Sequence, residues 1–467
     1  MKKLIFNLFF IVFCSTVLFS QTSGDDYFEK QDYRNAAMRY ELEAQNNPDA
    51  YLNLGKSYFA LQEFEIAVEA LENYKKKGSN VDEEMVNNFI KLIKRDDDYV
   101  EVLNIGAPVN TEKTEYMPII SLDNKRLYFI STNRPGGLGN EDAWYADKTE
   151  DGKWGKPVAF NQINTSSHEG VLSMSGDGNT AILFGNYKGS FGSGDIFYSV
   201  KTESGWSMPC NLGGTINSDN WEAQAKLAPD GKTLLYCISS DAGYGSSDIY
   251  MSQLTDDGWT TPVNLGSTIN TAEGDYGPFM AADMKTLYFH SYGHQGFGGC
   301  DIYMAKRKGD SWTEWSEPVN LGKYINSMHD DKYISIPASG NRGYMVREGQ
   351  PDGFGDMDIY EFIIPPSMRP EIVFNIYGQV TDENDEPVGA IIRFIDTKNN
   401  VEKAKAVSSI NDGMYKVSLP IMRKYQIVID MKGFLYYTDE LDLTNDSLWR
   451  DQETMQQKLA NEMDNIK

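Results

Sequence analysis

Short apolar runs separated by polar turns fill most of the chain between residues 98 and 365. In WEAQAKLAPDGKTLLYCISSDAGYGSSDIYMSQLTDDGWTTPVNLG, residues 221–266, four such runs follow one another between Asp-Gly and Gly/Ser turns. Runs of this length that are bounded by turn residues predict β-strands. No helical periodicity of 3.6 residues persists between the turns, so we expect no long helix in this region.

The same four-strand pattern recurs five times. An aspartate at the start of the third strand marks each copy, and successive copies lie 53, 53, 53 and 57 residues apart. The five aspartates are Asp142, Asp195, Asp248, Asp301 and Asp358. A turn aspartate and a tryptophan followed by a proline recur in the same phase in most copies. Repeats of about 40–50 residues with four strands each are typical of β-propeller blades.

The fifth copy lacks its last strand, and a match to that strand precedes the first copy. VLNIGAPVNT at 102–111 resembles VNLGSTINT at 263–271. A ring whose last blade takes its fourth strand from the N-terminal end leaves no open sheet edge. The sequence therefore predicts a mainly β fold with a five-bladed β-propeller over residues 98–365.

The segments beside the propeller predict two smaller domains and a tail. Residues 22–97 include YLNLGKSYFALQEFEIAVEAL, whose Gly, Tyr, Ala and Leu have the spacing of a tetratricopeptide (TPR) repeat, which predicts an α-helical domain. Residues 372–446 alternate apolar and polar positions between Asp, Asn and Gly turns, which predicts a small β-sandwich. Residues 447–467 carry apolar residues four apart and predict a helical tail.

The first twenty residues, 1–20, predict a signal peptide for export. Two lysines precede the apolar run LIFNLFFIVFCSTVLF, and Ser20 supplies the small residue before a cleavage site. Phe13 is bulky where a lipoprotein signal has a small residue, which argues against lipid attachment at Cys14. No later stretch is long and apolar enough to predict a membrane helix. We therefore expect an exported chain.

The charge balance excludes two classes of partner. The 467 residues include 68 acidic and 43 basic side chains, which gives a formal net charge of −25. An acidic surface repels nucleic-acid backbones and anionic lipid, so we expect neither as a partner. Cys210, Cys237 and Cys300 occupy repeat positions that hold other residues in the remaining copies, which predicts small buried side chains rather than a disulfide framework.

Each repeat also carries a glycine three residues before its motif aspartate and an apolar residue just before that glycine. The glycines are Gly139, Gly192, Gly245, Gly298 and Gly355. The apolar residues are Leu138, Phe191, Tyr244, Phe297 and Phe354. We interpret the glycine and the aspartate as a structural turn, in which the glycine takes a positive φ and the aspartate accepts backbone amides. Alternatively, the apolar residues form a docking rim for a partner.

A second series of carboxylates precedes the innermost strand of each repeat. Its members are Glu115, Glu169, Glu222, Asp275 and Asp331. In one interpretation each carboxylate accepts amides from the neighbouring blade and holds the blades together. In the other, the five carboxylates ring the mouth of the axial channel and bind a cation or a basic peptide loop. Like charges so close together would then need counter-charges.

The repeats SGDGNTAILF and APDGKTLLYC, with WTTPVNLG, resemble the PD40 family of WD40-like β-propeller repeats. GQVTDENDEPVGAIIRF, with NDGMYKVSLP and MKGFLYY, is similar to the carboxypeptidase regulatory-like (transthyretin-like) domain. Together with the preceding TPR-like helices they resemble the periplasmic PorE-like, OmpA-family proteins of Bacteroidetes. The resemblance implies a periplasmic protein associated with the outer membrane and with the type IX secretion and gliding machinery. The OmpA-like domain that would bind peptidoglycan has no counterpart in this sequence.

These features predict a non-enzymatic scaffold that binds cell-envelope proteins through a groove of the TPR helices and a propeller face. Peptidoglycan would be a partner only if another chain supplied an OmpA-like domain. No catalytic, metal or cofactor residue is expected, because His290 and His294 lie in a Gly-rich loop and neither GxSxG nor a Walker loop occurs. The alternative is a glycan-binding or sialidase-like propeller, since SGDGNT resembles the Asp-box turns of sialidases, although no arginine cluster accompanies it.

Overall fold

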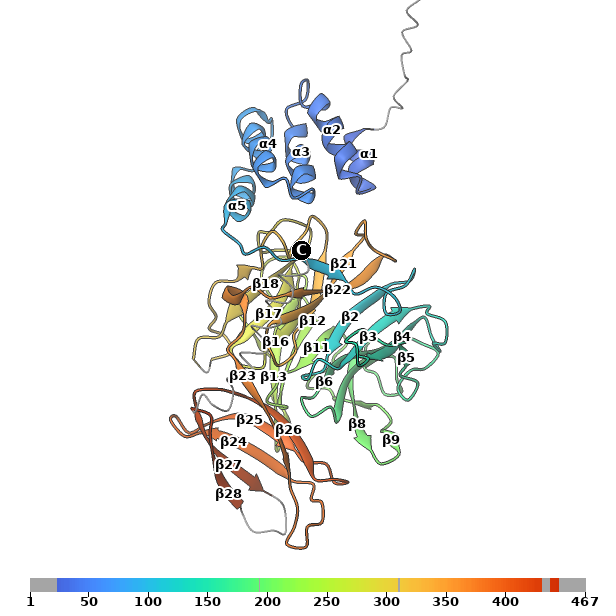
Figure 1. Ribbon diagram of the computed structural model, residues 1–467, viewed down its shortest axis with the longest axis vertical. Helices are drawn as coiled ribbons and strands as arrows, with labels where there is room; N and C mark the ends of the chain where they lie inside the picture. The colour runs from blue at the N-terminus through green and yellow to red at the C-terminus, as the bar shows by residue number, and fades with distance from the viewer. Residues whose placement is uncertain (1–22, 193, 310, 431–436, 445–467) are drawn as a thin grey trace, which may run out of the picture. The chain divides into compact units, whose positions relative to one another are not determined.

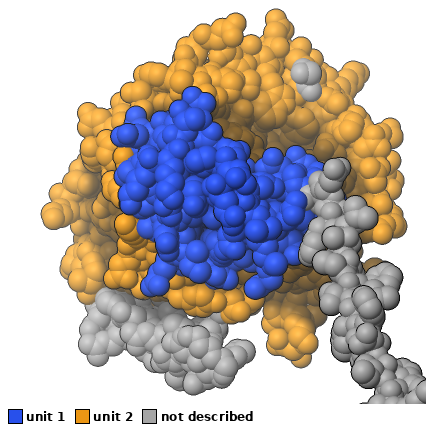
Figure 2. All heavy atoms as spheres, turned by 90° about the horizontal axis from the view of Figure 1, so that it is seen from above, with its two compact units in different colours: residues 1–86 blue, residues 87–467 orange. Residues whose placement is uncertain are grey.

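A computed structural model describes residues 23–444 apart from residues 193, 310 and 431–436 (Figure 1). The predicted signal peptide, 1–20, and the predicted tail, 447–467, lie outside the described residues. The chain divides into two compact units, residues 1–86 and residues 87–467, which Figure 2 distinguishes by colour. Within the described residues, no helix is long and apolar enough to cross a membrane.

The first unit is built from short antiparallel helices. They are α1 (Gly24–Glu29), α2 (Tyr33–Glu43), α3 (Ala50–Ala60) and α4 (Phe64–Lys77), with α5 (Glu83–Lys94) continuing into the second unit. Ser23 starts α1 with a capping box, in which its side chain and that of Asp26 each accept the other's backbone amide. Small residues let the helices approach closely: a Cβ at Gly55 of α3 would lie 2.7 Å from Leu71 Cγ of α4.

The described part of residues 102–363 forms five antiparallel sheets. The first contains β2 (Glu115–Ile120), β3 (Arg126–Thr132), β4 (Glu141–Asp147) and β5 (Val158–Ala159). The second contains β6 (Glu169–Met174), β7 (Thr180–Gly185), β8 (Asp195–Thr202), β9 (Gly205–Trp206) and β10 (Cys210–Asn211). The third contains β11 (Trp221–Leu227), β12 (Thr233–Ser239), β13 (Asp248–Thr255), β14 (Gly258–Trp259) and β15 (Val263–Asn264).

The last two sheets follow the same order and close the ring. The fourth contains β16 (Asp275–Met280), β17 (Thr286–Ser291), β18 (Asp301–Lys306) and β19 (Val319–Asn320). The fifth contains β20 (Asp331–Ser335), β21 (Arg342–Glu348), β22 (Met357–Ile363) and β1 (Val102–Asn104). Strand β1 therefore comes from the start of the region and pairs antiparallel with β22, Leu103 opposite Glu361.

The first strands of these sheets contact one another in a closed cycle. β2 contacts β6, β6 contacts β11, β11 contacts β16, β16 contacts β20, and β20 contacts β2. Apolar side chains fill the space between neighbouring sheets, and Phe129 of β3, for example, packs in one cluster with Tyr344 and Val346 of β21. Burying each such side chain contributes about 2–3 kcal/mol. The chain is thus mainly β, and the closed cycle of sheets is a β-propeller.

A buried asparagine fastens each sheet to the loop that leads to the next one. In the third sheet Ile249 N donates to Asn270 Oδ1 over 2.8 Å, and Asn270 Nδ2 donates to Ile249 O over 3.0 Å. The equivalent residues are Asn110, Asn164, Asn217 and Asn326, and each bonds, in the same way, the residue that follows the motif aspartate of a third strand. Asn110 makes this contact with Ile359 and so fastens the N-terminal segment to the last sheet.

A second β-domain follows the propeller within the same compact unit. After the short 3₁₀ helix η1 (Pro366–Met368), β23 (Val373–Gln379) pairs with β26 (Met414–Pro420). A four-stranded sheet has the order β25 (Val401–Val407), β24 (Ile391–Asp396), β27 (Lys424–Asp430), β28 (Tyr437–Asp442). Phe394, Leu419 and Tyr425 are buried in one core between the two sheets.

Candidate functional site

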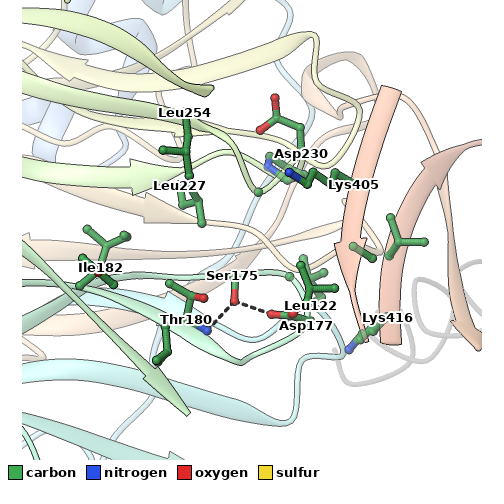
Figure 3. Close-up of a pocket in the computed structure, with 18 of the residues that line it drawn as sticks. Leu122, Ser175, Asp177, Thr180, Ile182, Leu227, Asp230, Leu254, Lys405 and Lys416 are labelled. Carbon is green, nitrogen blue, oxygen red and sulfur yellow. Dashed lines mark hydrogen bonds between the residues drawn. The ribbon is translucent and has the colours of Figure 1, made fainter. Parts of the chain in front are cut away.

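A pocket of about 420 Å³ lies between the propeller and the C-terminal β-domain (Figure 3). One wall is apolar and comes from the second and third sheets; it contains Tyr198, Leu212, Leu227, Leu254 and Trp259. The polar lining comes from two propeller turns and from strands β25 and β26; it contains Ser175, Asp177, Asp230, Lys405 and Lys416. The pocket thus combines an indole and a phenol ring with carboxylates and amines.

The two pocket carboxylates belong to turns at the ends of β6 and β11. Asp177 Oδ1 accepts hydrogen bonds from Ser175 Oγ and from the amide of Asn179, and Figure 3 shows Ser175 between Asp177 and Thr180. Asp230 accepts bonds from two backbone amides and one hydroxyl of residues 232–233 through both of its oxygens. Asp177 Oδ2 has no such donor among the described residues and is therefore available to a ligand.

The amines of the pocket come from the C-terminal domain. Lys416 Nζ lies 3.7 Å from Asp123 Oδ2 in a partly exposed ion pair. Lys405 forms no ion pair or side-chain hydrogen bond with any described residue, so its ammonium group can donate to a ligand. An ion pair between Lys232 and Glu402 links the two domains beside the pocket. The pocket therefore offers both acceptors and donors around an apolar wall.

The predicted apolar rim lies at the opposite end of the strands from this pocket. In the third sheet Thr233, next to the pocket turn, pairs with Gln253, whereas Ile238 pairs with Asp248 beside the rim loop. Leu138, Phe191, Tyr244 and Phe354 are each 50–56% exposed. Phe297 is only 3% exposed, because the ring of Phe89 in α5 packs against it with the ring centroids 5.7 Å apart. Whether the exposed members bind a partner stays a prediction.

The loops behind the rim contain the predicted glycine–aspartate turns. Asp248 accepts hydrogen bonds from the amides of Tyr244 and Gly245 at 2.7 and 3.0 Å. Asp142, Asp195, Asp301 and Asp358 accept the equivalent amides.

The expectation that the glycine of each turn takes a positive φ is wrong. None of Gly139, Gly192, Gly245, Gly298 and Gly355 has one. Glycine is required there by close packing instead, because a Cβ on Gly245 would lie 1.9 Å from the carbonyl oxygen of Glu273. That carbonyl belongs to the loop that leads into the next sheet.

The second carboxylate series is buried at the start of the innermost strands. Glu115, Glu169, Glu222, Asp275 and Asp331 are each at most 1% exposed. Each accepts hydrogen bonds from the Ser or Thr four residues earlier, as Glu169 does from Thr165 N and Oγ1. Burial raises the pKa of Asp331 to about 6, against the charge of Arg347, which lies 3.1 Å away.

The Ser and Thr donors of these hydrogen bonds lie in the loop that leads into each sheet. Among the described residues no group of three or more His, Cys, Asp or Glu side chains could hold a metal ion. His290 is a buried residue of strand β17, so its prediction as part of a Gly-rich loop is wrong, and burial lowers its pKa to about 3. A cation or basic peptide in the channel stays a prediction.

Sequence reasoning missed the pocket because its parts are far apart in the chain. In the sequence Trp259 is one of the tryptophans that mark the repeats, and Lys405 and Lys416 lie about 150 residues further on. Nothing local indicates that the C-terminal domain covers the turns around Asp177 and Asp230.

No family model matches the chain, and no curated protein matches it. Several solved structures resemble it at low identity. One titled "Glycoside hydrolase" has a TM-score of 0.42 at 9% identity and covers 63% of this chain and 99% of its own. An α-L-arabinofuranosidase from Lactobacillus brevis has a TM-score of 0.37 at 12% identity and covers 62% and 95%. A thermostable family-43 glycoside hydrolase has a TM-score of 0.37 at 13% identity and covers 57% and 97%.

These comparisons contradict the resemblance to PorE-like, OmpA-family proteins, since the similar structures are glycoside hydrolases and no family model identifies TPR or OmpA-family sequence. The assignments to TPR repeats and to type IX secretion fall with that resemblance. The comparisons contradict the predictions of a scaffold and of a non-enzyme as well. TM-scores this low do not transfer the activity of those enzymes. The β-propeller itself stands on the closed cycle of sheets.

Proposed function

We propose that this chain is a glycan-acting β-propeller protein and that it binds a carbohydrate in the pocket between the propeller and the C-terminal β-domain. The observation that carries the proposal is the composition of that pocket: its lining combines the rings of Trp259 and Tyr198 with the free oxygen of Asp177 and the free amine of Lys405.

A sugar ring has an apolar face of C–H groups and a periphery of hydroxyl groups. The apolar face packs well on an indole, which combines a large apolar surface with a rigid shape. The hydroxyl groups can donate to a carboxylate and accept from an ammonium group. A volume of 420 Å³ falls within the range of about 300–1,000 Å³ that is usual for small-ligand sites. The pocket therefore matches a mono- or disaccharide in both size and chemistry.

The charges around the pocket favour a ligand whose part inside the pocket is uncharged. Asp177 and Asp230 supply negative charge, and Lys405 and Lys416 supply positive charge. A simple anion or cation would meet a like charge on one side of the pocket. A polyhydroxylated ligand can use both kinds of group, because each hydroxyl is at once a donor and an acceptor.

We further propose the finer architecture that this function would use. The five sheets of residues 98–365 are five blades, which the repeat spacing of the sequence supports. The domain at 372–446 is a transthyretin-like sandwich, supported by its two packed sheets. Residues 22–97 form a helical domain. Residues 1–20 direct export, which would bring the pocket into contact with extracytoplasmic glycans.

A glycan array probed with the chain from residue 21 onward tests the proposal, followed by titration calorimetry with each glycan that binds. Trp259→Ala should weaken binding about two- to tenfold, since an aromatic packing partner contributes about 0.5–1.5 kcal/mol. Trp206→Ala is the matched control, because Trp206 ends β9 as Trp259 ends β14 but does not line the pocket. Release of reducing sugar from the same glycans reads out cleavage. Binding by no glycan, or equal loss in the two variants, would overturn the proposal.

A further inference from the structure

A second cavity, of about 200 Å³, is lined by the same position of all five innermost strands. This position lies four residues after the buried carboxylate of each sheet. The five residues there, which we call the axial collar, are Ile119, Ser173, Lys226, Phe279 and Ser335. Because the innermost strands form a closed cycle, the collar encircles the propeller axis.

Lys226 is the one charged member of the collar, and it is 6% exposed. No carboxylate oxygen of a described residue lies within 4.0 Å of its ammonium nitrogen, and it makes no side-chain hydrogen bond with any of them. Burial alone lowers its pKa, to about 7. Burying a charge without a partner is costly, so a lysine kept at this place indicates a ligand that pairs with it.

Two serines of the collar have hydroxyl hydrogens to donate. Ser173 Oγ accepts the amide of Leu227 at 3.0 Å, and Ser335 Oγ accepts the amide of Ile120 at 3.0 Å. An oxygen that accepts an amide still carries its own O–H donor, and neither hydroxyl donates to any described residue. The collar therefore supplies an ammonium group and two hydroxyl donors with no acceptor of its own.

The other titratable groups near Lys226 do not replace that acceptor. The other titratable lining residues are Asp177, Tyr128, Lys416 and Asp123, the last of which pairs with Lys416. Neither lining carboxylate has an oxygen within 4.0 Å of the Lys226 ammonium nitrogen. His290 lies close enough for the charge of Lys226 to lower its pKa, and burial keeps it near 3, so this imidazole is neutral at physiological pH. The charge of Lys332 also lowers the pKa of His290.

We propose that the cavity inside the axial collar binds one carboxylate group, which pairs with Lys226 Nζ and accepts hydrogen bonds from Ser173 and Ser335. A carboxylate is acceptor-only and offers two oxygens, which suits three convergent donors. The carboxylate belongs either to a small free organic acid or to a uronic-acid unit of a bound glycan. The second source rests on the proposed function; the cavity shares Ser175, Asp177 and Leu227 with the glycan pocket, so one acidic oligosaccharide could occupy both.

Titration calorimetry on the chain from residue 21 onward tests this proposal with three probes: acetate, galacturonate and galactose. At about pH 6, where Lys226 is charged, acetate or galacturonate should bind, and Lys226→Met should weaken that binding about ten- to hundredfold. Binding should weaken between about pH 6 and pH 8 as the amine loses its proton. Lys226→Arg, which stays charged, should bind with little change over the same range. Circular dichroism shows that each variant is folded.

Equal binding of the carboxylates to the wild type and to a folded Lys226→Met variant would overturn the site, and so would no binding at all. Binding of galacturonate without acetate assigns the carboxylate to a glycan, and binding of acetate alone assigns it to a free acid. Binding of acetate with a blank glycan array would leave this site standing while the proposed function fails. Binding of galactose that is unaffected by Lys226→Met, without binding of either carboxylate, would support the proposed function and overturn the carboxylate site.

Discussion

Asn110 is the side chain on which closure of the propeller depends most directly. It lies in the segment before the first sheet and is 1% exposed. Its Oδ1 accepts the amide of Ile359 at 3.0 Å, and its Nδ2 donates to Ile359 O at 2.8 Å and to Asn104 Oδ1 at 2.7 Å. Strand β1, which carries Asn104, is at the same time paired with β22. Asn110→Ala removes all three bonds and leaves the backbone between the two ends of the ring otherwise intact.

The expected loss of stability in Asn110→Ala follows from those three hydrogen bonds. Each contributes about 1 kcal/mol to stability, and the amide and carbonyl of Ile359 would remain buried without a partner at about 1 kcal/mol or more each. We therefore expect Asn110→Ala to lower the free energy of unfolding of the propeller by about 3–5 kcal/mol, a large part of the stability of a typical domain.

Urea unfolding followed by tryptophan fluorescence measures this cost, since every tryptophan except Trp449 lies in the propeller region. Asn270→Ala is the internal counterpart: it breaks the same three kinds of bond within continuous chain and should cost the same. Asn186→Ala, which loses one bond of 3.4 Å at the surface, is the control and should change stability by less than about 0.5 kcal/mol. If Asn110→Ala lowered the free energy of unfolding by less than about 1 kcal/mol while Asn270→Ala lowered it by about 3–5 kcal/mol, closure by the N-terminal segment would be refuted.

Three further predictions test other parts of the structure. Gly245→Ala should lower the urea midpoint strongly, because its Cβ would lie 1.9 Å from Glu273 O, a backbone atom that cannot move aside alone. His290 has a folded pKa of about 3, below its value of 6.5 in the unfolded chain, so the unfolded state takes up a proton first as the pH falls. Stability should thus decline between about pH 6.5 and 3, and His290→Gln should show a smaller decline in urea titrations across that range. Cys210 is exposed, so the prediction from its repeat position that it is buried is wrong, whereas Cys237 and Cys300 are buried. Cys210 should therefore react with a thiol reagent in the native state and the other two only after unfolding, and Cys210→Ser should remove the native signal.

The sheets of the propeller could be predicted from the sequence because their determinants are local and repeated. Turn residues, alternating apolar positions and the aspartates at regular intervals all recur within each copy. The match of residues 102–111 to 263–271 also located the strand that pairs with β22. These features depend on neighbours in the chain, so a sequence displays them directly.

The parts that could not be predicted depend on contacts between distant segments. Gly245 is required by a carbonyl group in the next loop and not by its own φ. Phe297 is covered by Phe89, some two hundred residues earlier in the chain. The sequence does distinguish Lys226 from its counterparts. Four residues after the carboxylate, the other copies have Ile, Ser, Phe and Ser, so Lys226 is the one charged residue at this repeat position. The sequence does not show that these five positions line one cavity, because this depends on how the five strands meet around the axis.

The most direct test of the central claim is a structure of the protein with the glycan that binds it best on the array. The account predicts a sugar ring lying against Trp259, with hydroxyl groups within hydrogen-bond distance of Asp177 Oδ2 and Lys405 Nζ. A glycan bound instead at the other end of the strands, against Phe191 or Tyr244, with the pocket unchanged, would contradict it.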